Sequence, residues 1–201
     1  MAKRLQAAER RASILAVAKV LFADKGYHGV SVDEIAARLA VSPAVLYRHF
    51  SSKQDLYEAV LSEIACKREN YVELVVRGPD DFGGMLARMT LMYVESVARD
   101  PDYLRMELHA ALAGSQAARQ FFENRWRPFA DYIEFGLSEL RKEDHAAAGV
   151  NPRIAALMFQ GMVREALYAK IVYQADRYRD HGLADLVKQL VAMFLRAVGV
   201  R

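Results

Sequence analysis

The sequence predicts an all-α protein, and two observations carry that prediction. Apolar residues recur every three or four positions in one segment after another, which is the spacing of an amphipathic helix. Between these segments stand residue types that begin helices, such as Ser, Asn and Pro, and a type that ends them, Gly. With 53% hydrophobic and 26% charged residues, the 201-residue chain is expected to fold around a substantial core.

The first expected helix covers residues 5–25 and ends before Gly26, a residue type that is common just past a helix C-terminus. One face of this helix carries apolar side chains at positions i, i+4, i+7 and i+8, so we expect that face to be buried. These side chains belong to Ile14, Ala18, Leu21 and Phe22.

Two short helices are expected between residues 31 and 50. Ser31 and Glu34 have the spacing of a capping box, in which each side chain satisfies a backbone N–H at the start of the helix. A second start follows at Ser42 and Pro43, because Ser caps helices and Pro suits the first helical position. Helices this close in sequence must cross steeply, as in a helix-turn-helix, whose second helix fits the DNA major groove.

The distribution of charge agrees with a nucleic-acid contact near the N-terminus. The whole chain has a net charge of +3. Its first 53 residues hold nine Lys and Arg against four Asp and Glu, a balance of +5 that leaves −2 for the remainder. A basic N-terminal part fits a DNA-binding module. An ordinary solvated charged face is the alternative.

The run LFADKGYHGVSVDEIAARLAVSPAVLYRHFSSKQDLYEAV, from Leu21 to Val60, resembles the DNA-binding domain of the TetR family of bacterial transcriptional regulators. It carries the family's glycine, capping serine, tyrosine, phenylalanine and lysine in register. The resemblance implies an all-helical homodimer with a DNA-binding domain at residues 1–52 and a ligand-binding and dimerisation domain at residues 53–201. One departure is Ala40, which replaces the usual glycine of the turn. A positive φ at this alanine would cost on the order of 1 kcal/mol.

The resemblance also implies roles for side chains on the second short helix, where Leu46 and Phe50 should face inward. Tyr47, His49 and Lys53 match the family's phosphate-contacting positions, and all three can donate hydrogen bonds. Packing beside Phe50 is the alternative for the first two. Base reading would rest mainly on small and apolar side chains. Only Arg48 could make a bidentate contact to guanine. The predicted DNA-contacting residues are Ser31, Ser42, Pro43, Ala44, Val45, Tyr47, Arg48, His49 and Lys53.

The remaining chain is also expected to be helical. A polar stretch should start the fourth helix near Lys53, and Asn151 with Pro152 should start the penultimate one. Pro128 lies inside a long helical pattern and predicts a kink or break there. The expected helices cover residues 53–77, 82–99, 102–113, 116–142, 153–173 and 183–198.

Methionine and aromatic side chains on these helices predict an adaptable apolar pocket for a small molecule. Methionine accommodates varied shapes, and aromatic walls suit flat or oily ligands. Plain core packing is the alternative for each residue. The predicted pocket residues are Met89, Met92, Tyr93, Trp126, Phe129, Met158, Phe159 and Met162.

The last two expected helices each carry an apolar stripe. The first stripe is Ile154, Leu157, Met158, Gly161 and Met162, and the second is Leu186, Val187, Leu190, Val191, Phe194 and Val198. The resemblance implies that both helices pair with their counterparts across a two-fold axis to form a homodimer. The alternative is that both stripes close the core of a single chain.

These patterns favour a ligand-responsive regulator of transcription, a repressor released from double-stranded operator DNA by a small apolar or aromatic effector. The alternative is a DNA-binding dimer without such an effector, controlled by a protein partner. The sequence has no nucleophile–base motif, phosphate-binding glycine loop or metal cluster, so we predict no enzyme activity, catalytic residue, cofactor or metal. It also has no apolar run long enough for a membrane span and no signal-peptide pattern, so a cytoplasmic protein is expected.

Overall fold

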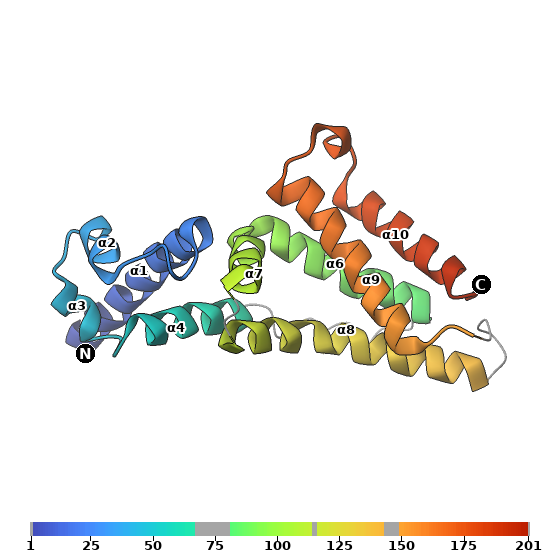
Figure 1. Ribbon diagram of the computed structural model, residues 1–201, viewed down its shortest axis with the longest axis horizontal. Helices are drawn as coiled ribbons and strands as arrows, with labels where there is room; N and C mark the ends of the chain where they lie inside the picture. Colours follow the sequence, from blue (N-terminus) through green and yellow to red (C-terminus); the bar gives the residue numbers. More distant parts are fainter. Residues whose placement is uncertain (1, 67–80, 114–115, 143–148, 201) are drawn as a thin grey trace. The chain divides into compact units, whose positions relative to one another are not determined.

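The computed structural model of the protein describes residues 2–66, 81–113, 116–142 and 149–200 (Figure 1). Every regular element in these ranges is helical, as predicted. The chain forms two compact units, the first made of Met1–Lys67 with Asp102–Phe122 and the second of Arg68–Pro101 with Glu123–Arg201. The functional division at residues 52 and 53 stays a prediction.

The first unit is built around its N-terminal helix. Its elements are α1 (Ala2–Lys25), α2 (Val32–Arg38), α3 (Pro43–Tyr47), α4 (Lys53–Cys66) and α7 (Asp102–Ala113). Helix α1 packs against α2, α4 and α7. The predicted inner face of α1 is confirmed, because none of its four side chains is more than 2% exposed. The expected continuation of the fourth helix to residue 77 lies outside the described residues.

The predicted starts of α2 and α3 are confirmed in position, but only part of the predicted side-chain capping forms. The Ser31 Oγ accepts a hydrogen bond from the Glu34 backbone N–H at 3.1 Å. The Glu34 carboxylate pairs with Lys25 Nζ at 2.5 Å rather than with the Ser31 N–H, so only half of the capping box forms. Ser42 is the residue before α3, and Pro43 is its first residue, yet the Ser42 hydroxyl makes no capping hydrogen bond.

The turn between α2 and α3 places Ala40 in the left-handed region, with φ at 52°. The Val41 backbone N–H reaches back to the Ala36 carbonyl oxygen at 3.1 Å, which closes the turn. An alanine Cβ is strained in this conformation, whereas glycine adopts it freely. The strain anticipated for this departure from the family sequence is therefore present.

The second unit contains α6 (Phe82–Arg99), the part of α8 (Gln116–Lys142) from Glu123 onward, α9 (Pro152–Leu167) and α10 (Leu183–Ala197). Helices α6, α9 and α10 pack on one another (Figure 1). Helix α8 continues through Pro128, so the proline does not break it. The predicted helix at residues 153–173 ends earlier as an α-helix, because a π-helical turn, Tyr168–Val172, follows Leu167.

Helix α9 has two apolar faces, and the chain buries only one of them. The buried face carries Ala155, Ala156, Phe159, Val163 and Leu167. The stripe expected from the sequence lies on the other face, where Ile154, Leu157 and Met158 are 54%, 55% and 56% exposed. The stripe of α10 behaves differently, since Val187, Leu190, Val191, Phe194 and Val198 are all buried within the unit.

Candidate functional site

Helix α3 is held in the first unit by two buried side chains and turns the rest of its surface outward. Leu46 and Phe50 are 1% and 3% exposed, as their spacing predicted. The Arg11 guanidinium lies over the Phe50 ring, 4.9 Å from its centroid, and covers this anchor. The side chains left exposed or half-buried are Ser42, Pro43, Ala44, Val45, Tyr47, Arg48 and His49.

The predicted phosphate donors on α3 and just after it differ in how accessible they are. Tyr47 is 54% exposed, so packing does not account for the position of its ring, and its hydroxyl is available to a partner. His49 is half-buried. Ser31, at the start of α2, already accepts a hydrogen bond through its Oγ and retains its O–H as a donor.

Lys53, at the start of α4, is engaged within the protein. Its Nζ donates hydrogen bonds to the backbone carbonyl oxygens of Tyr27 and Val30, at 2.8 and 2.9 Å. The ammonium also lies 4.3 Å from the centroid of the Tyr27 ring. An ammonium has three N–H donors, so one remains for an outside acceptor. The sequence did not predict this internal role, since the acceptors are backbone atoms of a distant segment.

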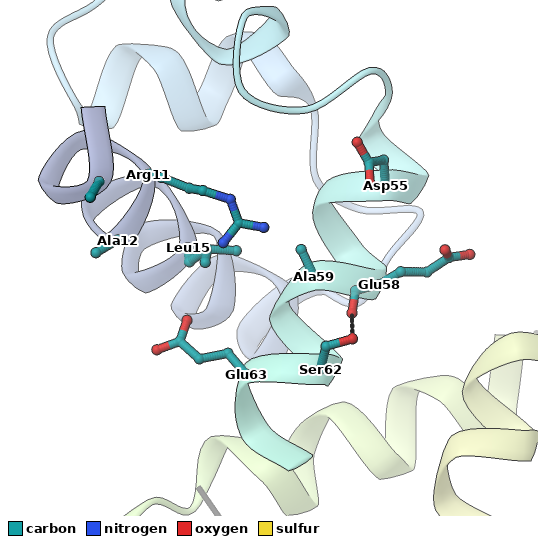
Figure 2. Close-up of a pocket in the computed structure, with 9 residues that line it drawn as sticks. Arg11, Ala12, Leu15, Asp55, Glu58, Ala59, Ser62 and Glu63 are labelled. Carbon is teal, nitrogen blue, oxygen red and sulfur yellow. Dashed lines mark hydrogen bonds between the residues drawn. The ribbon is translucent and has the colours of Figure 1, made fainter. Parts of the chain in front are cut away.

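Among the described residues of the first unit, α1 borders one groove with α4 and another with α3. The α1–α4 groove, of about 730 Å³, is lined by Ala8, Arg11, Ala12, Leu15, Asp55, Glu58, Ala59, Ser62 and Glu63. Figure 2 shows Arg11 extending from α1 toward α4, whose residues Asp55, Glu58 and Glu63 bring three carboxylates to the lining. This excess of acid makes the α1–α4 groove a poor surface for phosphate. The second groove, between α1 and α3, is lined by Gln6, Ala7, Glu9, Arg10, Ser13, Val45, Arg48 and His49 and has a volume of about 750 Å³.

In the second unit, three of the predicted pocket residues meet in one aromatic cluster. The Tyr93 ring centroid lies 4.9 Å from that of Trp126 and 5.7 Å from that of Phe129, and the latter two are 5.7 Å apart. All three side chains are buried. The Trp126 indole Nε1 is also buried and has no hydrogen-bond acceptor among the described residues. A buried donor without an acceptor is costly, and such groups mark positions where a ligand or water can bind.

The other predicted pocket residues do not join this cluster. Phe159 packs on Phe194 of α10, with ring centroids 4.8 Å apart. Met89 is fully buried in α6, whereas Met92 and Met162 are half-buried. Met158 lies on the exposed face of α9. That the eight residues line a ligand pocket stays a prediction.

Residues 14–60 match the family model described as "Bacterial regulatory proteins, tetR family". The chain is 32% identical over 172 residues to the HTH-type transcriptional repressor Rv3405c of Mycobacterium tuberculosis, a match covering 75% of this chain and 89% of that protein. The chain belongs to the TetR family. The HTH-type transcriptional activator FasR of Mycolicibacterium smegmatis is 55% identical over 58 residues, which span 29% of this chain and about a quarter (26%) of FasR.

A solved structure shares the fold of this chain. The FadR regulator from Bacillus subtilis, crystallised with stearoyl-CoA, aligns with a TM-score of 0.72 at 17% identity over 93% of this chain and 98% of that one. This likeness establishes a shared fold. The recognised TetR segment contains α2, α3 and the first part of α4, so the helix-turn-helix of this TetR-family regulator is its DNA-binding module.

The family assignment makes the protein a regulator of transcription rather than an enzyme. Within the described ranges, no three His, Cys, Asp or Glu side chains come together as a metal site. None of the helices described is long and apolar enough to cross a membrane.

Proposed function

We propose that this TetR-family chain is a repressor that binds operator DNA as a homodimer and leaves it when an acyl-CoA binds in its second unit. The observation that carries the DNA-binding part is the anchoring of α3. Two buried side chains and a covering arginine fix the helix, while small side chains and the Tyr47 hydroxyl face outward. Small and apolar groups can approach thymine methyls closely, and flanking donors fix the helix on the phosphates.

Repression is proposed because the relative with the broadest sequence match named above is called a repressor. A bound dimer would cover the operator, and both half-sites would have to be about 34 Å apart, one turn of DNA. Because bacterial DNA is in the cytoplasm, the protein would act there.

The effector class is proposed from the aromatic cluster and from the ligand of the FadR structure, stearoyl-CoA. Tyr93, Trp126 and Phe129 supply apolar walls for an acyl chain. The buried Trp126 N–H supplies a hydrogen-bond donor for an acyl carbonyl, which would relieve its present lack of an acceptor. A small-molecule effector explains this combination better than a protein partner, because the donor is not accessible to a surface contact.

Dimerisation is proposed through α9 and α10. Ile154, Leu157 and Met158 form an exposed apolar face on α9, and Met193 on α10 is 56% exposed. Apolar side chains gathered on one face favour burial against another protein surface. A second copy presents the same face, so a two-fold axis would bury both.

The function is tested with a labelled duplex from the region upstream of the protein's own gene. Fluorescence anisotropy would measure binding, followed by titration with butyryl-, octanoyl- and palmitoyl-CoA. Free coenzyme A and the corresponding fatty acids serve as controls. We expect binding of the duplex and release by at least one acyl-CoA but not by coenzyme A. Binding that no acyl-CoA reverses would contradict the effector, while absence of binding to any duplex would contradict DNA recognition.

A further inference from the structure

The α1–α3 groove gathers positive charge beside the recognition helix. Arg10 of α1 lines it together with Arg48 and His49, which follow the last residue of α3. Glu9 is the one acidic residue in this lining. Arg10 was not among the residues predicted to contact DNA.

The basic side chains of this groove have no partner in the part of the chain that the structure describes. Among those residues, the side chains of Arg10, Arg48 and His49 form no ion pair or hydrogen bond, and both arginines are exposed. Two guanidinium groups on one groove repel each other, so an anion bound between them is favoured. A guanidinium also presents paired N–H donors that match a phosphate.

The neighbouring Arg11 has different surroundings from Arg10. The Arg11 guanidinium lies over the Phe50 ring. Arg11 also lines the acidic α1–α4 groove (Figure 2). Arg10 instead shares its groove with Val45 and Arg48, two residues predicted to read bases. Arg11 therefore contacts the Phe50 ring, whereas Arg10 lies on the open α1–α3 groove.

The position of the groove identifies the anion. A helix seated in the major groove of DNA is bordered by the two sugar-phosphate backbones. The α1–α3 groove opens at the end of α3, beside the surface predicted to face the bases. A backbone phosphate of the same DNA is therefore the anion in reach.

We propose that Arg10 binds a backbone phosphate of the operator in the α1–α3 groove and so adds α1 to the DNA-contacting surface. This inference rests on the proposed operator binding. The contact positions the protein without reading sequence, because all nucleotides carry the same phosphate. It also gives a role to the N-terminal half of α1, which precedes the buried Ile14 and Phe22.

The test compares the salt dependence of DNA binding in Arg10→Gln, Arg10→Lys and Arg105→Gln. Arg105 is an exposed arginine of α7 in the same unit, and its replacement removes the same charge away from α3. Anisotropy with the upstream duplex and with a scrambled duplex would give the slope of log K against log[salt]. We expect Arg10→Gln to reduce the slope by about 0.9 for each phosphate that the protein no longer neutralises, or about 1.8 for a dimer, on both duplexes.

Arg10→Lys should keep most of the slope, because a lysine also neutralises a phosphate, and Arg105→Gln should leave it unchanged. Thermal unfolding of each variant would show that the exposed substitution leaves the fold intact. An Arg10→Gln slope equal to that of the wild type would overturn the inference while leaving operator binding standing. A reduction confined to the upstream duplex would overturn it too, as that outcome indicates base reading. A wild-type protein that binds neither duplex would refute both proposals.

Discussion

Lys53 Nζ lies 2.8 Å from the carbonyl oxygen of Tyr27 and so ties the start of α4 to the segment between α1 and α2. The same ammonium donates to the Val30 carbonyl oxygen at 2.9 Å and lies over the Tyr27 ring. The segment it holds leads directly into Ser31, the cap of α2. Lys53 therefore braces the helix-turn-helix from inside, with its third N–H left for a phosphate.

Replacing this lysine should weaken both the fold and DNA binding. Lys53→Met keeps most of the alkyl stem but removes two charge-assisted hydrogen bonds, so we expect the free energy of unfolding to fall by about 1.5–3 kcal/mol. Urea denaturation would measure it, with Lys188→Met, at an exposed lysine of α10, as the control. A variant that unfolds like the wild type but binds DNA weakly would show that the two Lys53 hydrogen bonds do not contribute to the free energy of unfolding. Only the phosphate contact would then account for the role of Lys53.

Ala40→Gly should stabilise the protein. The alanine has φ at 52°, and relief of its Cβ strain outweighs the greater freedom of glycine in the unfolded chain, for a net gain of about 0.5–1 kcal/mol. Ala37→Gly is the matched control, because Ala37 is an exposed residue inside α2. That change should destabilise by about 1 kcal/mol. Thermal denaturation should therefore shift in opposite directions for the two variants, and a shared direction would contradict the strain at residue 40.

The sequence was sufficient to predict the features that depend on near neighbours. Pro43 at the start of α3 and the inward positions of Leu46 and Phe50 follow from spacing within a few residues, and all three are confirmed. The partners of Lys53 and the grouping of Arg10 with α3 could not be predicted in this way. They depend on how helices pack, and backbone carbonyl acceptors carry no residue signature.

Helix α9 illustrates a second limit. Its apolar residues surround most of the helix, so periodicity alone does not tell which face packs inside the chain. Phe159 lies on the buried face, while its neighbour Met158 lies on the exposed one. A helix face that is buried in a dimer interface has the same apolar composition as a face that is buried in the core of one chain. Only the packing of α9 against α6 and α10 separates the two.

Alkaline pH should destabilise the first unit through Tyr57. Burial raises the pKa of its phenol from 10.0 to about 12, and the nearby Tyr27 contributes to the same shift. The unfolded chain releases the proton from about pH 10, whereas the folded protein holds it, so rising pH favours unfolding between these values. The difference in unfolding free energy between wild type and Tyr57→Phe should be constant below pH 10. Above it, the wild type should lose up to about 1.4 kcal/mol per pH unit relative to the variant. Urea denaturation across this range would check it, and a constant difference would contradict the shift.

Effector binding should be visible in the emission of Trp126. The chain contains one tryptophan, and its ring lies within the Tyr93 and Phe129 cluster. An acyl-CoA that enters beside it changes the polarity around the indole and gives its N–H an acceptor. We expect the fluorescence change and the release of the upstream duplex to have the same midpoint when both are measured at one protein concentration. A ligand that releases DNA without changing this emission would place the effector away from the cluster.

The exposed face of α9 gives the sharpest test of dimerisation. Met158→Glu places a charge where a two-fold interface would bury the side chain, and the symmetric partner would bring a second carboxylate close to it. We expect light scattering at micromolar concentration to show a dimer for the wild type and a monomer for this variant.

Leu112→Glu, at an 88% exposed position on α7, is the control and should remain dimeric. Because one half-site contributes only part of the binding free energy, the monomeric variant should also bind the upstream duplex much more weakly. If the Met158→Glu protein stays dimeric, the dimer interface does not include this face of α9. In that case the exposed stripe of Ile154 and Leu157 would need a different partner.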